Sequence, residues 1–272
     1  MLFLSRLPIT RFICYLLMGL AAVAVLAISA EEVSTRIYRR RAERLLYDLR
    51  QLQVGKSTFE DARAVIMRHA GGVSPFDHSG CGPAHCTFVV GVEHFPFRME
   101  AWGRHLNIEA EYYALRALPP LGLQDWESGG DVRIDGGIVT HIGYRVVVRG
   151  SGGWVLGYFA VEDRAAARHL PDLMVERPYF VHWFNITTVG GGEGIESSLT
   201  PQASTEERNR AYNFNFDCLT RRGGCTSLCQ IAPLAFADYV KETGGMPWLD
   251  EHDPNCAKFK QPAANPDHAA HP

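Results

Sequence analysis

The chain opens with nineteen consecutive uncharged, mostly apolar residues, 12–30, behind a short leader that carries Arg6 and Arg11. A helix of this length rises about 28 Å, close to the roughly 30 Å of hydrocarbon in a bilayer. The N-terminal position is that of an export signal or a membrane anchor. We therefore predict a transmembrane anchor or signal peptide over residues 1–30, with Cys14 as an ordinary cysteine of that segment.

Apolar residues then recur at intervals of three and four, which predicts a basic amphipathic juxtamembrane helix over residues 31–55. Arg36, Arg40 and Arg44 fall on the face opposite the apolar stripe. We expect this face to be solvated while the stripe packs on a domain, and attraction to anionic lipid headgroups is compatible with that packing. The stripe consists of Tyr38, Ala42, Leu45, Leu46, Leu49 and Leu52.

A second helix is predicted after residue 57. Ser57 and Glu60 have the spacing of a capping box, and Gly71-Gly72 should end the helix. The same segment contains Gly-Lys-Ser, as a phosphate-binding loop does, but Arg50 stands where that loop requires its first glycine, so nucleotide binding is not expected. The apolar face of this helix is formed by Phe59, Ala62, Ile66, Met67 and Ala70.

Between residues 86 and 186 the pattern becomes that of strands, rich in β-branched and aromatic residues. Gly136-Gly137 and the segment 150–153 supply the positive-φ residues that hairpin turns require. Consecutive hairpins indicate an antiparallel sheet, with a short helical turn at 165–170 and a flexible loop at 190–194. The predicted strands lie at residues 87–93, 98–102, 108–116, 131–134, 138–149, 154–162 and 179–186.

The last part of the chain is helical again. Ser204 and Glu207 form a second capping box, and the helix is predicted to run toward Thr220. The predicted class is α+β, with an α+β domain over 56–198, a cysteine-bearing helical portion over 199–260 and a disordered tail over 261–272.

Six of the seven cysteines follow the apolar segment, and an even set beyond an export segment indicates disulfides. Only four residues separate Cys81 from Cys86, so these are paired. Cys225 and Cys229 lie one helical turn apart, a poor geometry for a bond within a helix. We therefore predict the disulfides Cys81–Cys86, Cys218–Cys225 and Cys229–Cys256.

Zinc binding is the alternative for the cysteines. Its first ligands would come from a nine-residue cluster, and a second pair would have to come from Cys225 and Cys229. The sequence Cys-Gly-Pro-Ala-His-Cys differs from the thioredoxin motif by two inserted residues, so redox catalysis is not expected. The cluster consists of His78, Cys81, His85 and Cys86.

The segment LQVGKSTFEDA, residues 52–62, resembles the helix-opening motif of small bacterial envelope lipoproteins of the outer-membrane-assembly type, although their lipidated cysteine is missing. Residues 59–71, together with LTPQASTEERNRAYNFNFDCLTRRGGC at 199–225, are similar to a group of uncharacterised, membrane-anchored bacterial proteins found chiefly in acidobacteria. No activity is attached to that group, so this resemblance implies architecture and location only.

Two features of the sequence make opposite predictions about the side of the membrane on which the bulk of the chain lies. Five arginines closely follow the apolar segment and two precede it, which by the positive-inside rule favours a cytoplasmic bulk. The six cysteines favour an oxidising compartment, and we give them more weight. The expectation is a single-pass protein of the bacterial inner membrane with its bulk in the periplasm. A cleaved signal and a cytoplasmic bulk are the alternatives. The five arginines are Arg36, Arg39, Arg40, Arg41 and Arg44.

No catalytic signature accompanies this architecture. Nucleophile-elbow and metalloprotease motifs are missing, and a net charge of −3 gives no nucleic-acid footprint. No catalytic, cofactor-binding or metal site is therefore predicted, and the histidines are expected at the surface or hydrogen-bonded in the core. We expect a non-enzymatic binding or structural component of the envelope, with the membrane and another envelope protein as partners. The alternative is an exported, hydrolase-like enzyme whose site combines distant His and Asp/Glu residues.

Overall fold

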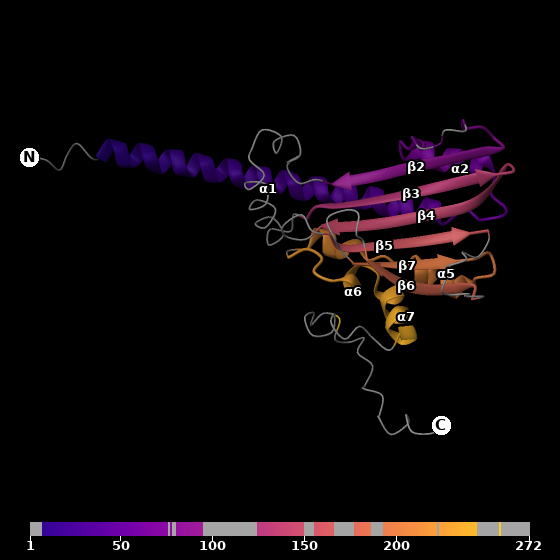
Figure 1. Ribbon diagram of the computed structural model, residues 1–272. Coiled ribbons are helices and arrows are strands. Elements are labelled where there is room, and N and C mark those ends of the chain that lie inside the picture. The colour runs from indigo at the N-terminus through magenta and orange to yellow at the C-terminus, as the bar shows by residue number, and fades with distance from the viewer. Residues whose placement is uncertain are drawn as a thin grey trace, which may run out of the picture.

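The computed structural model describes residues 7–75, 77, 80–94, 124–149, 155–165, 177–185, 193–221, 223–243 and 256. Within them the chain is an α+β protein in which helices cover one face of a seven-stranded sheet and a long N-terminal helix projects beyond it (Figure 1). The strands predicted at 98–102 and 108–116, the helical turn at 165–170 beyond its first residue, and the tail lie outside the described residues.

The N-terminal helix α1 (Leu7–Leu49) joins the predicted apolar segment and the predicted juxtamembrane helix without a break. It is the one helix of the described part that is long and apolar enough to cross a membrane. Its second part packs on the sheet through the predicted stripe, in which Ala42, Leu45 and Leu49 are fully buried. No glycine or proline occurs in α1 after Gly19, so no residue of the usual kinking types separates the two parts.

The sheet has the strand order β1-β2-β3-β4-β5-β7-β6. All neighbouring strands are antiparallel except β5 and β7, which are parallel. The prediction of consecutive antiparallel hairpins is therefore wrong at this point, because β7 was missed. The strands are β1 (Gly72–Val73), β2 (His85–His94), β3 (Trp126–Asp135), β4 (Ile138–Arg149), β5 (Val155–Arg164), β6 (Tyr179–Asn185) and β7 (Glu193–Leu199).

The turn between β3 and β4 is formed as predicted, because Gly136 and Gly137 have φ angles of 61° and 84°, a region that favours glycine. Gly71 does not end the preceding helix by its φ angle. It is instead a close-approach position, since a Cβ there would lie 2.6 Å from the carbonyl oxygen of Val89. The positive φ after the helix belongs to Ala70, at 56°.

Two helix starts test the predicted capping boxes. The box formed by Ser204 and Glu207 opens α5 (Thr205–Ala211) as predicted. The box of α2 (Phe59–Arg68) is formed one residue later than predicted, by Thr58 and Asp61. The hydroxyl of Ser57 is otherwise engaged, since it accepts a hydrogen bond from the amide of Gln53 at 2.9 Å.

The predicted continuation of α5 to Thr220 is wrong. The α-helix ends at Ala211, and a 3-10 helix, η3 (Phe216–Thr220), follows, capped by the side chain of Asn215. The amide of Asn215 donates a hydrogen bond to the carbonyl of Ile231 at 2.7 Å, a tertiary contact that diverts the backbone from a continuous helix. The remaining helices are α6 (Leu228–Ile231) and α7 (Pro233–Thr243).

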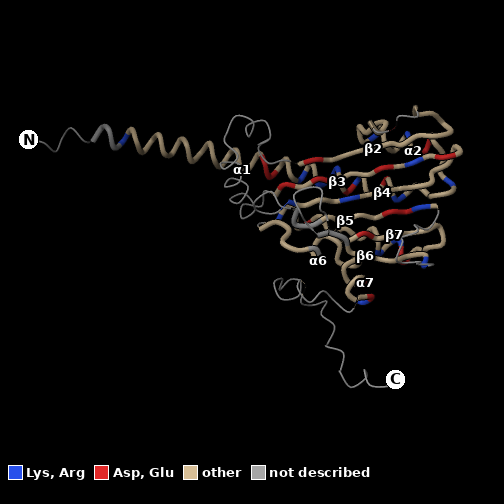
Figure 2. The backbone as a smooth tube through the Cα atoms, viewed as in Figure 1, with Lys and Arg blue, Asp and Glu red and all other residues tan. Residues whose placement is uncertain are grey.

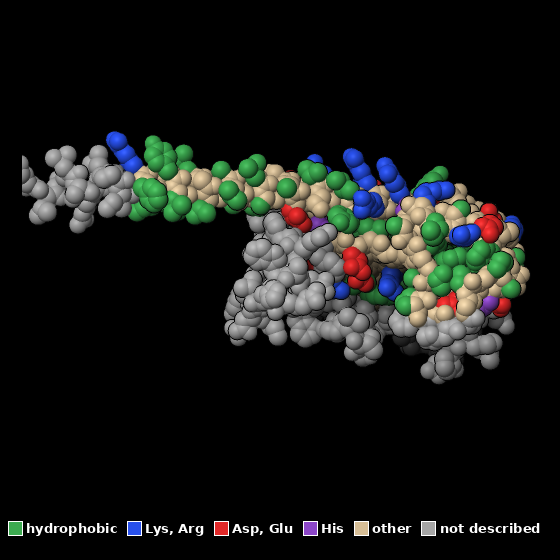
Figure 3. Space-filling view, turned by 90° about the horizontal axis from the view of Figure 1, so that it is seen from above, with side chains coloured by type: hydrophobic (Ala, Val, Ile, Leu, Met, Phe, Trp, Pro, Cys, Tyr) green, Lys and Arg blue, Asp and Glu red, His purple; other side chains and the backbone are tan. Residues whose placement is uncertain are grey.

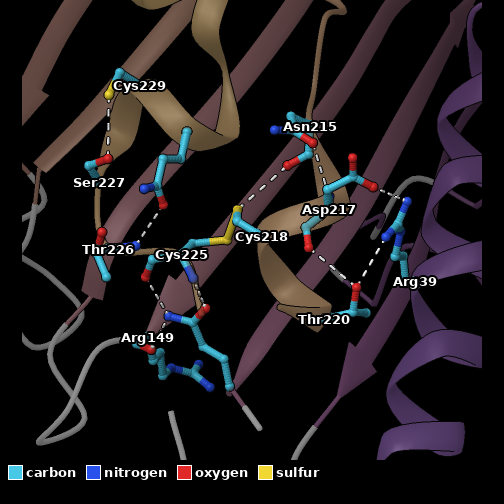
Figure 4. Close-up of a disulfide and its surroundings, with 12 residues drawn as sticks. Arg39, Arg149, Asn215, Asp217, Cys218, Thr220, Cys225, Thr226, Ser227 and Cys229 are labelled. Atoms are coloured by element: carbon cyan, nitrogen blue, oxygen red, sulfur yellow. Dashed lines mark hydrogen bonds and ion pairs between the residues drawn. A yellow bond between two sulfur atoms is a disulfide. The ribbon is translucent and has the colours of Figure 1, made fainter. Parts of the chain in front are cut away.

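The three disulfides are those predicted: Cys81–Cys86, Cys218–Cys225 and Cys229–Cys256, with Cα–Cα distances of 4.4, 4.8 and 5.7 Å. The Cys218–Cys225 loop is attached on two sides (Figure 4). The buried amide of Gln124 donates to the carbonyl of Cys225 at 2.9 Å and accepts from its N–H at 2.6 Å. On the other side, Arg39 of α1 forms an ion pair with Asp217.

Candidate functional site

The candidate site is the face of the sheet opposite the described helices. Trp126, Tyr144 and Phe159 point toward the helices and are fully buried, whereas the alternating positions of the same strands carry charged groups. Figure 2 shows these charges across the central strands. We call the set the polar face: Asp131, Arg133, His141, Arg145, Tyr158, Glu162, Arg164, His182, Glu196 and Ser198.

The strand register brings these residues into neighbouring cross-strand rows. In one row, Asp131 lies opposite Gly143, Gly143 opposite Glu162, and Glu162 opposite Ser198. In the next row, Arg145 lies opposite Ala160, which lies opposite Glu196. Residues opposite each other have Cβ atoms about 5 Å apart. The polar face is thus a compact patch.

A hydrogen-bonded Asp–His pair lies within the polar face. The Nε2 atom of His141 is 3.1 Å from Oδ2 of Asp131, and His141 is only 8% exposed. Gly143 provides the space for this pair, since a Cβ at that position would lie 3.2 Å from Nε2 of His141 and closer still to the Asp131 carboxylate. The pair therefore depends on a glycine in the adjacent strand position.

A β-bulge places His141 on this face. Val139 pairs with Ile134 on the helix side, but His141 pairs with Arg133, so Thr140 is an extra residue in β4. Without it, strand alternation would put His141 on the same face as Val139. The bulge therefore brings the imidazole beside Asp131.

The carboxylate of Asp131 is held ionised by its surroundings. Burial raises its pKa, but the hydrogen bond with His141 and the positive charges of Arg133 and Arg145 lower it further than burial raises it, so the net shift is downward. Burial likewise raises the pKa of Tyr158, and Arg145 opposes this shift. The charges of Glu196, Glu162 and Asp131 raise the same pKa, so these groups interact electrostatically as one cluster.

The other carboxylates of the polar face also have partners. Glu162 forms an ion pair with Arg164. Glu196 is 7% exposed, lies 3.9 Å from His182 and accepts a hydrogen bond from the hydroxyl of Ser198 at 3.3 Å. Each of the three acids of the polar face therefore has a partner close by.

The polar face also carries two guanidinium groups that do not pair with these carboxylates. Arg133 and Arg145 are exposed, and neither has an ion-pair or hydrogen-bond partner in the described part of the chain. Arg145 extends across Gly129, where a Cβ would lie 3.9 Å from its Nε atom. These groups have the charge and planar donor geometry that recognise carboxylate or phosphate oxygens.

The residues predicted from the sequence lie elsewhere. Cys81 and Cys86 are bonded to each other, and so are the other predicted pairs, so none is a free thiolate for zinc. His78 lies outside the described residues, and within them no group of three or more His, Cys, Asp or Glu side chains is arranged to hold a metal ion. His141 was expected at the surface or hydrogen-bonded in the core, and it is largely buried and paired with Asp131. The grouping of these residues into a polar face was not predicted. Its signal was the charged alternation at Asp131 and Arg133 and at His141 and Arg145.

Comparisons with protein-family models, with curated proteins and with solved structures found no match.

Proposed function

We propose that this chain is a membrane-anchored, extracytoplasmic binding protein of the bacterial envelope that holds a charged ligand or partner on its polar face. The observation that carries the proposal is the charge arrangement of that face. Its three carboxylates are paired, whereas Arg133 and Arg145 are exposed and unpaired within the described residues. A face that served only as the solvated side of a sheet would not need the bulge and the glycine that assemble the Asp131–His141 pair.

The proposed location rests on two features. The apolar part of α1 is exposed along its length, as a membrane span would be, and six cysteines form three disulfides, which persist outside the cytoplasm. The inner membrane is the proposed compartment. A fusion of alkaline phosphatase after residue 272 should be active, because this enzyme needs an oxidising environment. An inactive phosphatase fusion together with a fluorescent GFP fusion would place the bulk in the cytoplasm.

The domain should stand at a fixed orientation on the membrane. The hydroxyl of Thr35 donates to the carbonyl of Glu31 at 2.8 Å and lies 2.6 Å from Nε2 of His94, so the imidazole N–H donates to Thr35. Thr35 follows residue 30 by about 7.5 Å along the helix axis. The strands run alongside α1 (Figure 1), so the polar face should stand upright from the bilayer surface.

In-cell crosslinking of the full chain tests the binding role. A photoreactive phenylalanine analogue replaces Val89, which lies opposite Asp131 in the register. We expect an adduct that falls at least fivefold in the double variant Arg133→Glu, Arg145→Glu and is unchanged in Lys56→Glu, an exposed control. The absence of an adduct, or one indifferent to the two reversals, would refute the role.

An exported enzyme is the second candidate, and the Asp131–His141 pair favours it. A carboxylate that orients an imidazole is a common arrangement for general acid–base catalysis. The variant His141→Gln separates the two functions. A binding surface should keep its adduct and most of its cellular role, whereas an enzyme would lose the role and keep the adduct.

A further inference from the structure

Besides the polar face, the structure exposes the side of α1 that faces away from the sheet. Figure 3 shows basic and hydrophobic side chains projecting from this side of the helix. Val33, Ile37 and Tyr47 are 57%, 46% and 64% exposed there. At 100° per residue these positions and the exposed arginines share one stripe. We call it the arginine face: Val33, Arg36, Ile37, Arg40, Arg44 and Tyr47.

The arginines of α1 differ in their partners. Arg39 turns toward the domain, where it donates to Glu43 at 2.7 Å and to Thr220 at 3.1 Å. Arg36 lies 4.0 Å from Glu32. Arg40 and Arg44 have no hydrogen-bond or ion-pair partner among the described residues. The domain thus provides hydrogen-bond partners for Arg39, which points inward, and its described part provides none for Arg40 and Arg44, which point outward.

We propose that the arginine face docks an acidic helix that rises from the membrane beside α1 and belongs to a neighbouring membrane protein. This inference rests on the anchored topology proposed above but not on the polar face. Val33 and Ile37 would contact apolar residues of the partner near the membrane, and Arg40 and Arg44 would pair with its carboxylates at spacings of three or four.

Lipid headgroups fit the arginine face less well. Along a helix axis, Arg36, Arg40 and Arg44 lie about 9, 15 and 21 Å beyond residue 30. The polar layer of a bilayer adds only about 5–8 Å on each side of the hydrocarbon. The contacts of α1 with the sheet keep the helix from lying down on the surface. Arg36 therefore lies at the outer edge of the headgroup layer, and Arg40 and Arg44 lie beyond it.

A second copy of this chain fits less well too. Two copies in one membrane are parallel, and a two-fold axis along α1 would bring Arg40 and Arg44 against the same residues of the other copy. Like charges so placed destabilise an interface. The observations therefore favour a different protein with acidic residues at this height.

A photoreactive residue in place of Tyr47, in the full chain and in cells of its own host, tests the proposal. We expect a protein adduct whose crosslinked peptide carries Asp or Glu at intervals of three or four, next to an apolar span. The adduct should fall at least tenfold in the double variant Arg40→Glu, Arg44→Glu. It should be largely retained in Arg40→Lys, Arg44→Lys and in the control Lys56→Glu.

The charge reversals lie at exposed positions, so the three disulfides should still form, and a non-reducing gel and the phosphatase fusion verify folding and export of each variant. An adduct with lipid, an adduct with a second copy, an adduct undiminished by the reversals, or no adduct would each overturn the proposal. Loss of the Val89 adduct would bear on the polar face alone, so the two proposals fail separately.

Discussion

The two faces of the sheet are made from the same strands and differ in what satisfies their side chains. On the helix side, Tyr144 is fully buried and its hydroxyl donates to Ser128 at 3.2 Å, within a continuous apolar core. On the polar face, charged groups satisfy one another or remain available. Strand alternation therefore places the apolar core on one face and the charged groups on the other. Substitutions on the first should change folding, and those on the second should change binding.

The largest expected effect is on the helix side. Trp126 is fully buried in the core. Trp126→Ala should lower the free energy of unfolding by about 3–5 kcal/mol, because it removes a large side chain and leaves a cavity. The matched aromatic change on the polar face, Tyr158→Ala, should lower it far less. Denaturant unfolding of both variants measures the contrast, and equal losses would contradict the division between the two faces.

The second-largest loss of stability should follow removal of the disulfide Cys229–Cys256. Both cysteines are buried in the core, and the bond closes a sequence separation of 27 residues. In the chain-entropy model, replacing both by serine lowers the free energy of unfolding by about 3–4 kcal/mol. The same change at Cys81 and Cys86, with a separation of 5, should lower it by about 2 kcal/mol. Thermal unfolding of both double variants tests the order.

The helix side should also make stability depend on pH. Burial lowers the pKa of His94 to about 4, below its value of about 6.5 in the unfolded chain. The folded state then binds fewer protons than the unfolded state between these values. The stabilisation is complete above about pH 6.5 and declines as the pH falls to about 4, by up to about 3 kcal/mol.

Unfolding of the wild type and of His94→Phe from pH 7 to pH 4 measures this effect. The variant should lose much of the slope between pH 6.5 and pH 4, because it has no imidazole to titrate. An unchanged slope would show that another group causes the pH dependence.

A smaller effect is expected from the glycine that supports the Asp–His pair. Gly143→Ala would place a Cβ against Asp131 and His141, and should lower the free energy of unfolding by about 1–3 kcal/mol. Gly91→Ala is the matched control on the same face, because nothing lies within 4 Å of a Cβ there. Denaturant unfolding of both variants sharpens the comparison, and similar values would show that the pair is not tightly packed.

The smallest effect on stability should be that of Arg145→Ala. Its guanidinium is exposed, so the free energy of unfolding should change by less than about 0.5 kcal/mol. The crosslink at Val89 should nevertheless decrease. A large loss of stability would assign Arg145 to the fold instead of the binding surface.

The sequence by itself determined the features that depend on neighbouring residues. These include the apolar segment, the buried stripe of α1, the strand Ile138–Arg149, the Gly136-Gly137 turn and the three disulfides. Each follows from a local period, a required φ angle or the spacing of cysteines along the chain, with Cys229 and Cys256 left to pair after the two closer pairs are formed.

Only the tertiary structure decided β7. Its sequence has no clear strand pattern, and its parallel pairing with β5 supplies the backbone hydrogen bonds that hold it in the sheet. It also decided the polar face. The alternating charges at Asp131 and Arg145 are visible in the sequence, but the bulge at Thr140 sets the face of His141, and the register brings Glu196 beside them. These positions depend on pairing between distant segments, which local patterns do not specify.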